Sequence, residues 1–243
     1  MIVAEIGLNH LGRVQILDEY INIPSNVDAV TIQVISDNFY DHPNNKSLKI
    51  SDKILIEFID KIHNLGIKVG LAIDDYKKIN KFLPSKISFY KILSKDIENK
   101  KLIDEVRKTN AESIYISTGT SDYNLLDTII PPLIKSDKRI KLIHTTLSND
   151  IAAVNLKAIE TMRNRYKVPI AYGHHCSMLN AIYASLGFMP ESVFFYIKSS
   201  QDLRYPDNAH AIELPNIEEL VCDIKGIKKS IGNGEKLSMK NWR

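Results

Sequence analysis

A single lysine interrupts an otherwise apolar stretch, Phe89-Tyr-Lys-Ile-Leu-Ser94, and places a strong chemical demand on the fold. Burying an ammonium group without a partner is costly in free energy, so Lys91 must meet an anion. That anion is either a carboxylate of the protein or a phosphate or carboxylate of a bound molecule. We favour the bound molecule, which makes Lys91 a candidate for holding a substrate.

A hydroxyl-rich turn, Ile116-Ser-Thr-Gly-Thr-Ser121, offers a second place for an anion. The turn leads into a predicted helix, and the backbone N–H groups and dipole at the start of a helix favour negative charge. Ser121 also suits the N-cap of that helix, which would explain part of the pattern without a ligand. Both interpretations stay open.

Three histidines close two further apolar runs, at Ile143-His-Thr-Thr146 and Tyr172-Gly-His-His175. Successive residues of a strand face opposite sides, so at most one of His174 and His175 faces inward if the strand is regular. Each histidine alone is explained by a structural hydrogen bond. Together with His144 they predict a divalent-metal site, since neutral imidazoles bind such ions.

Eight apolar runs, each closing on a polar or charged residue, must position these side chains. Between the runs lie segments of helical period, such as Ser51 to Gly66, where a serine cap and a glycine stop bound one apolar face. Strand followed by helix, repeated along the chain, is typical of parallel β/α units. The sequence therefore predicts a single-domain α/β fold, a (β/α)8 TIM barrel, whose active site gathers at the carboxyl ends of the strands. The runs are Ile2–Glu5, Ala29–Gln33, Val69–Asp74, Ile87–Lys91, Ile114–Ser117, Ile140–His144, Pro169–His175 and Ser192–Lys198.

A doubly wound open sheet is the alternative fold, but no glycine-rich dinucleotide turn follows the first run. The length of 243 residues matches one barrel. A polar loop at 36–48 lies near the expected mouth, either as a lid or as a plain surface loop. Further helices are predicted at 75–83, 98–108, 123–130, 154–166, 178–186 and 217–231.

The composition excludes several classes of protein. The formal net charge of +3 is spread along the chain, which predicts neither a nucleic-acid partner nor a membrane surface. No apolar stretch approaches the length of a membrane span and no leader precedes the first run, so we expect a cytoplasmic protein. Cys176 and Cys222 lack Cys-x-x-Cys spacing, which argues against a zinc knuckle or a disulfide framework.

Taken in order, these motifs resemble the sialic acid (N-acetylneuraminate) synthase family, and the chain is NeuB-like. The family's first motif, Ile-Ala-Glu-Ile-Gly-x-Asn-His-x-Gly, and its Leu-Ser-Thr-Gly-Met are fairly specific patterns, and their order makes coincidence improbable. The similar stretches here are Val3-Ala-Glu-Ile-Gly-Leu-Asn-His-Leu-Gly12, Tyr90-Lys-Ile-Leu-Ser94, Ile116-Ser-Thr-Gly-Thr120, Ile143-His-Thr-Thr146, Asn155-Leu-Lys-Ala-Ile159 and Pro206-Asp207.

The resemblance implies a transferase that condenses phosphoenolpyruvate with an N-acylated amino sugar, in nonulosonic acid and surface carbohydrate biosynthesis. In the family a divalent cation, manganese or magnesium, polarises the sugar aldehyde while the enol carbon attacks it, and water completes the loss of phosphate. By position it implies catalytic roles for Glu5, Lys91, Asp96 and Asp207, substrate contacts from Asn9, Gln33, Ser94, Ser117, Thr118 and Thr146, and metal binding by His175 with His174 or His144.

Two positions depart from the family pattern. Thr31 stands where the family has a phosphate-binding lysine, and Ile197 is aligned with the family's second metal histidine. An isoleucine cannot bind a metal ion, so the metal depends on a substitute ligand. The candidate substitutes are His174, His144 or His210 for the ligand, and Lys95 or Lys198 for the lost charge.

We expect the barrel to span 1–236, with 237–243 as a short tail and no antifreeze-like carboxyl-terminal domain. In the family that domain supplies an arginine to the neighbouring subunit of a swapped dimer, and a homodimer through barrel surfaces is the alternative here. Two other functions stay open. One is a catalytically inactive barrel that binds a sugar or phosphometabolite or pairs with another subunit, and the other is an aldolase or isomerase that uses Lys91.

Overall fold

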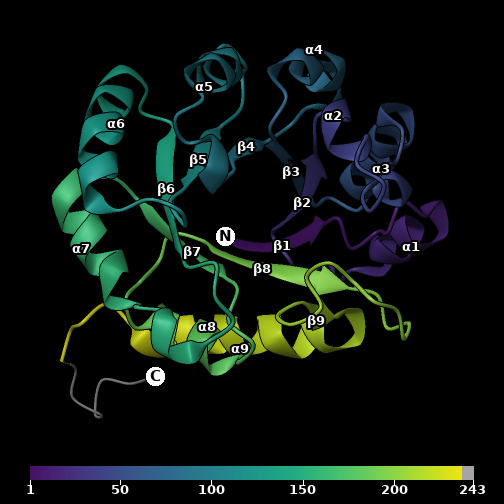
Figure 1. The fold of residues 1–243 in the computed structure, drawn as a ribbon. Helices are drawn as coiled ribbons and strands as arrows, with labels where there is room; N and C mark the ends of the chain where they lie inside the picture. Colours follow the sequence, from purple (N-terminus) through teal and green to yellow (C-terminus); the bar gives the residue numbers. More distant parts are fainter. Residues whose placement is uncertain (237–243) are drawn as a thin grey trace.

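Each barrel strand pairs in parallel with the next strand in sequence, and the last pairs with the first, so the sheet closes (Figure 1). The computed structural model describes residues 1–236. It confirms the predicted (β/α)8 barrel, while the predicted tail at 237–243 lies outside the described residues. The strands are β1 (Ile2–Gly7), β2 (Ala29–Val34), β3 (Lys68–Ile73), β4 (Phe89–Ile92), β5 (Ser113–Ser117), β6 (Ile140–Thr145), β7 (Ile170–His174) and β8 (Val193–Lys198).

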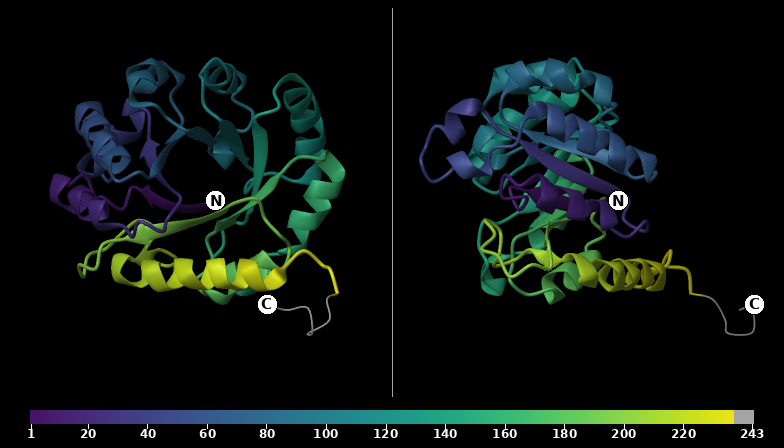
Figure 2. Two further views of the ribbon diagram at one scale, coloured as in Figure 1. Left: turned by 180° about the vertical axis from the view of Figure 1, so that it is seen from behind. Right: turned by 90° about the vertical axis from the view of Figure 1, so that its right-hand side faces the viewer.

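Helices surround the barrel, and the last of them, α9, lies beside α8 along one side of the molecule (Figure 2). A short ninth strand, β9 (Ile212–Glu213), pairs with the end of β8. Within residues 1–236, no helix combines the length and apolarity needed to cross a membrane. The helices are α1 (Val14–Glu19), α2 (Asp37–Tyr40), α3 (Asp52–Asn64), α4 (Ile79–Phe82), α5 (Lys100–Arg107), α6 (Tyr123–Ser136), α7 (Lys157–Tyr166), α8 (Asn180–Leu186) and α9 (Ile217–Ile231).

Local sequence accounts for both ends of α3. The Ser51 hydroxyl accepts a hydrogen bond from the Ile54 N–H at the start of α3, and Gly66 adopts a left-handed φ of +76° just after it, as predicted. Helix α6 runs further than predicted, through Pro131 and Pro132 to Ser136. Both prolines are exposed, so their missing N–H groups leave no buried carbonyl unpaired.

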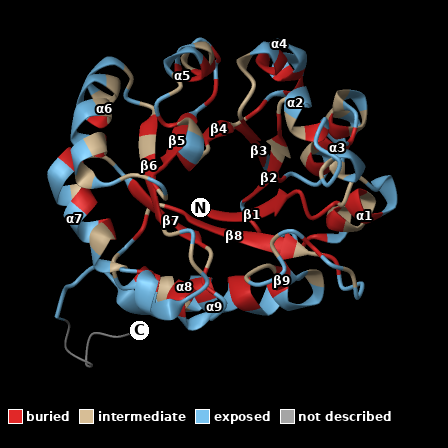
Figure 3. Ribbon diagram, viewed as in Figure 1, coloured by how far each residue is buried: buried red, intermediate tan, exposed pale blue. Residues whose placement is uncertain are grey.

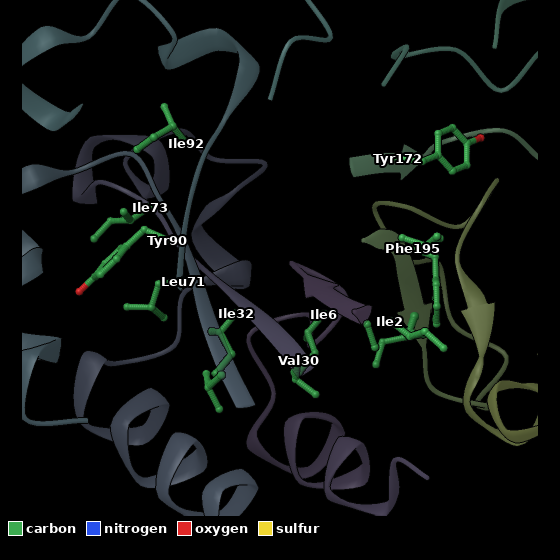
Figure 4. Packing of buried hydrophobic residues seen from close by; sticks show 14 of the residues in the cluster. Ile2, Ile6, Val30, Ile32, Leu71, Ile73, Tyr90, Ile92, Tyr172 and Phe195 are labelled. Carbon is green, nitrogen blue, oxygen red and sulfur yellow. The ribbon is translucent and has the colours of Figure 1, made fainter. Parts of the chain in front are cut away.

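Two apolar layers make the core. Strand side chains that point outward pack against the helices, among them Ile2 and Ile6 of β1 and Val30 and Ile32 of β2 (Figure 4). The strands are buried almost throughout, whereas the helices expose their outer faces (Figure 3). A second cluster fills the barrel itself and consists of Val3, Ala29, Phe89, Tyr115, Ile143, Ala171 and Phe194.

The inner cluster closes the amino-terminal half of the barrel. The rings of Phe89, Tyr115 and Phe194 meet edge to face, with centroids 5.0 to 6.1 Å apart. Gly70 of β3 leaves the space that the Phe89 ring occupies. Because this layer is filled, a ligand can enter only from the carboxyl-terminal end.

Replacement of Gly70 by alanine tests this packing. A Cβ atom at Gly70 would lie 2.2 Å from the Phe89 ring, so we expect Gly70→Ala to lower the free energy of unfolding by about 1–3 kcal/mol. The control is Gly226→Ala on exposed α9, where a Cβ meets no atom within 4 Å and should raise stability by roughly 0.5–1 kcal/mol. Urea unfolding measures both, and a Gly70→Ala protein as stable as the wild type would contradict the packing.

Candidate active site

Side-chain alternation places a polar layer directly above the apolar filling of the barrel. Residues two positions beyond the inner cluster, toward the carboxyl ends of the strands, share its inward orientation. Most of them are polar, and they line what we call the mouth of the barrel. They are Glu5, Thr31, Lys91, Ser117, Thr145, Gly173 and Tyr196.

A buried ion pair spans the mouth. The Lys91 Nζ donates a hydrogen bond to Oε1 of Glu5, and the two residues are 3% and 2% exposed. The Thr31 hydroxyl donates a hydrogen bond to the same Glu5 oxygen over 3.3 Å. Thr31, which stands where the family has a lysine, therefore helps to hold the Glu5 side chain in place. The Glu5 Oε2 atom is buried without a hydrogen-bond partner among the described residues. Of the two anions that the sequence left open for Lys91, the protein carboxylate is present.

Aromatic rings and imidazoles form one wall of the mouth. The Tyr196 ring lies 5.7 Å from the Lys91 Nζ and 5.4 Å from the His175 ring. His210, from the loop after β8, packs against His175, with ring centroids 4.9 Å apart and the ring planes tilted by 45°. Thr145 fixes the His175 ring through a hydrogen bond of 2.8 Å to Nδ1. Burial, followed by the charge of Lys91, lowers the pKa of His175 to about 3, so this imidazole is neutral at pH 7.

Asp207 brings a second carboxylate to the same place. Its Oδ2 atom and the Tyr196 ring both lie against Gly7, where a Cβ atom would clash with that ring at 2.6 Å. Burial, with a smaller contribution from Glu5, raises the pKa of Asp207 to about 7, and Lys91 opposes the shift. A carboxyl group with this pKa can both donate and accept a proton near neutral pH. We call Glu5, Lys91, His175, Tyr196, Asp207 and His210 the mouth cluster.

The structure gives Asn9 a supporting place beside the mouth. Its side chain is fully buried, and Nδ2 donates to the Ile197 carbonyl over 2.8 Å. Its Oδ1 accepts from the backbone N–H of Asp207 over 3.2 Å. Because both ends of the amide are occupied, Asn9 is placed to hold the loop that carries Asp207.

Other residues expected at the substrates lie at the same end of the barrel. Ser117 of β5 points into the mouth, and Gln33 lies on the inward face of β2, two residues beyond Thr31. Ser94 and Asp96 follow β4 in a short turn. Burial raises the pKa of the Asp96 carboxyl, whose Oδ2 has no hydrogen-bond partner among the described residues.

Three expected site residues point away from the mouth. His144, Thr118 and Thr146 line a cavity of about 260 Å³ between α6 and α7, which Thr145 of the mouth also lines. His144 hydrogen-bonds to the Val154 carbonyl over 2.9 Å, and the Thr118 hydroxyl donates to the carbonyl of Ile143. The structure does not bring these three side chains together with His175, because their positions alternate with the inward ones. Their roles at the substrates or the metal stay predictions.

The turn before α6 also differs from its prediction. Asp122, not Ser121, is the N-cap of α6, since the Asp122 carboxylate accepts from the Leu125 N–H over 2.9 Å. The Ser121 hydroxyl is buried and has no hydrogen-bond partner among residues 1–236.

Neither His174 nor Ile197 borders the mouth. His174 is buried on the outer face of β7, where Nδ1 meets the Tyr172 hydroxyl at 3.2 Å. Ile197 belongs to the core between the barrel and the helices. The residue of β8 that faces His175 is Tyr196, so the alignment of Ile197 with a metal ligand is one position out of register with the barrel.

Two imidazoles, those of His175 and His210, meet at the mouth. In the part of the chain that the structure describes, no group of three or more His, Cys, Asp or Glu side chains is arranged to hold a metal ion. The divalent metal therefore stays a prediction, with His175 and His210 as the imidazoles that the mouth offers.

A barrel with an apolar filling at one end and a buried ion pair among polar groups at the other has the architecture of a (β/α)8-barrel enzyme. A family model described as the NeuB family matches residues 28–236, and the chain belongs to that family.

Individual relatives agree with this assignment. N,N'-diacetyllegionaminic acid synthase of Campylobacter jejuni is 22% identical over 99% of this chain and 80% of its own length. An uncharacterized protein of Methanocaldococcus jannaschii is 26% identical over the whole chain and 75% of its own length. The crystal structure of N-acetylneuraminic acid (sialic acid) synthetase from Leptospira borgpetersenii has the same fold. It superimposes with a TM-score of 0.88 at 21% identity, covering 98% of this chain and 87% of that one.

The raised pKa of Asp207 predicts a pH-dependent stability. Protonated Asp207 is favoured in the folded state, so its contribution is complete below about pH 4 and is lost as the pH rises through about 7. The free energy of unfolding of Asp207→Asn should therefore gain on that of the wild type across this interval, by at most about 1.4 kcal/mol per pH unit. Urea unfolding at pH 5, 6, 7 and 8 measures the difference, and a difference that does not change with pH would contradict the assignment.

Proposed function

We propose that this protein joins phosphoenolpyruvate to an N-acylated amino sugar, making a 2-keto sugar acid in nonulosonic acid or surface carbohydrate biosynthesis. The observation that carries the proposal is Lys91, a buried ammonium group at the barrel mouth of a NeuB family member. Membership of the family supports synthesis of a sugar acid, and the relative from Campylobacter jejuni is named for such a reaction.

Phosphoenolpyruvate requires positive charge and hydrogen-bond donors at the mouth. The Lys91 ammonium has three N–H groups, and Glu5 accepts one of them. In our proposal the other two bind the carboxylate or phosphate of phosphoenolpyruvate. The hydroxyl groups of Ser94 and Ser117, at the ends of neighbouring strands, supply further donors.

The proposed reaction forms one carbon–carbon bond and breaks one bond to phosphate. The methylene carbon C3 of phosphoenolpyruvate attacks the aldehyde carbon, and the aldehyde oxygen takes up a proton to become a hydroxyl. Water then adds to C2, the carbon that bears the phosphate, and loses one proton. The C2–O bond to phosphate breaks, the remaining hydroxyl proton leaves with inorganic phosphate, and C2 becomes the keto carbon. Asp207, with its pKa of about 7, is the group we assign to give the proton. The unpartnered Oε2 of Glu5 is the acceptor we assign for the proton of water.

The geometry disfavours the aldolase that the sequence left open. A Schiff base needs the neutral amine of the lysine, because an ammonium group has no lone pair to attack a carbonyl. The Lys91 Nζ is instead engaged by the carboxylate of Glu5 in a buried ion pair.

A catalytically inactive binding barrel is the second candidate, and one observation favours it. The two lysines expected to replace the lost family charge already have protein partners. Lys95 donates to Asp74 over 2.8 Å, and Lys198 donates to Asn208 over 3.0 Å. Thr31, which stands where the family has a lysine, is uncharged and hydrogen-bonded to Glu5. The mouth therefore has fewer lysines available for a ligand than the resemblance implies.

Product formation tests the proposal. Purified protein is incubated with phosphoenolpyruvate and single N-acylated amino sugars, and mass spectrometry with a phosphate assay follows the 2-keto acid and inorganic phosphate. We expect Lys91→Met to lower the rate by about 100-fold or more, since it removes a buried group that stabilises charge. The control, Lys53→Met, removes a lysine of the outer helix α3 whose side chain is 86% exposed and should stay within a few-fold of the wild type.

The same assay also tests the divalent metal. Reactions with chelator and with added Mn²⁺ or Mg²⁺ test the divalent cofactor, which stays a prediction, as does a homodimer. Phosphoenolpyruvate binding without product from any sugar would favour the inactive barrel over the synthase.

A further inference from the structure

The loop after β8 is fastened over the mouth at several points. Its first part is held by a hydrogen bond from the Ser199 hydroxyl to Glu19, and its middle by the bond from the Asp207 N–H to Asn9. Its end returns as β9, where Ile212 pairs with Ile197. Figure 1 shows this segment extending past the end of β8 and turning back. The anchors fix the position of His210, which lies just before β9.

The His210 ring packs against two other rings of the mouth. Its ring packs against His175 at 4.9 Å in a tilted arrangement and meets Tyr196 edge to face at 5.2 Å. Its Nε2 lies 3.8 Å from Oδ1 of Asp207, which is too long for a hydrogen bond. The side chain is only 10% exposed.

Both ring nitrogens of His210 are buried and have no hydrogen-bond partner among the described residues. Buried polar atoms in folded proteins are nearly always paired, because an unpaired one has lost its bonds to water without replacement. Two unpaired atoms on one side chain, fixed by a well-anchored loop, therefore indicate a partner other than the protein. A neutral imidazole offers one N–H donor and one acceptor nitrogen to such a partner.

We propose that His210 is a sugar-binding residue that helps select the substrate, its two nitrogens pairing with a hydroxyl or amide donor and acceptor of the amino sugar. This inference rests on the proposed function and deepens it. A neutral imidazole suits such uncharged groups, whereas Lys91 suits the anionic phosphoenolpyruvate. The position of His210 beside Asp207, our proton donor to the sugar aldehyde, puts both residues at the same substrate.

Replacement of His210 by phenylalanine and by glutamine tests the assignment. His210→Phe keeps a ring against His175 and Tyr196 but removes both nitrogens, so we expect the KM for the sugar to rise about tenfold or more. The KM for phosphoenolpyruvate should stay within about twofold, since the uncharged ring does not contact it in this assignment. His210→Gln, whose amide keeps a donor and an acceptor, should recover part of the sugar affinity.

A matched control separates binding from folding. His63→Phe changes a histidine of the outer helix α3, where the imidazole bonds to the Ser85 carbonyl, and should leave both KM values unchanged. The melting temperature of His210→Phe should not fall, because the variant removes two unpaired buried groups. A fall in kcat with unchanged sugar KM, or an equal rise of both KM values, would overturn the proposal.

A direct measurement of sugar binding tests the role of His210 even if the proposed reaction does not occur. If the wild type forms no product, calorimetry with a panel of N-acetylated hexosamines still compares wild type with His210→Phe. Sugar binding that weakens in the variant supports the assignment even where the condensation fails. Equal binding to both proteins, or loss of Mn²⁺ binding alone in the variant, would show that His210 has another partner.

Discussion

The buried pair of Glu5 and Lys91 is the interaction on which the rest of the mouth depends. The two side chains come from β1 and β4, which are separated by β2 and β3, and only closure of the barrel brings them together. Breaking such a pair by removing one partner leaves an uncompensated buried charge, which typically costs about 3–5 kcal/mol. Loss of either side chain would therefore destabilise the barrel. The pair also fixes a positive charge at the end of the barrel where a ligand can enter.

Inside the barrel, an apolar layer that stabilises the fold lies below a polar layer that can bind a ligand. The aromatic cluster of Phe89, Tyr115 and Phe194 fills the amino-terminal half and excludes a ligand from it. The polar layer above it holds groups that the fold itself leaves incompletely bonded, including the Glu5 Oε2 and both nitrogens of His210. Unpaired buried atoms work against folding, so binding explains those at the mouth better than packing does.

The sequence predicted the barrel because each strand is an apolar run long enough to recognise without neighbours. Helix α1 was missed, since six residues are too few to show a helical period. The end of α6 was placed too early because adjacent prolines usually stop a helix, whereas here both face solvent. These errors are local, and they do not change the topology.

The site was harder to predict because the inward face of a strand depends on its register. His144 and Ile197 were chosen by motif, yet their neighbours Thr145 and Tyr196 are the residues that face the mouth. Counting alternate positions from an inner residue such as Phe194 would have found Tyr196. His210 has no such signal, because its place depends on a loop anchored by residues distant in sequence.

Calorimetric titration with phosphoenolpyruvate tests the central claim most directly, using wild-type protein and Lys91→Met under the same conditions. The structure predicts saturable binding to the wild type and none to the variant, since the buried ammonium is the charge that holds the anion. Equal binding to both proteins, or no binding to a folded wild type with or without divalent metal, would contradict the assignment of the mouth as a phosphoenolpyruvate site.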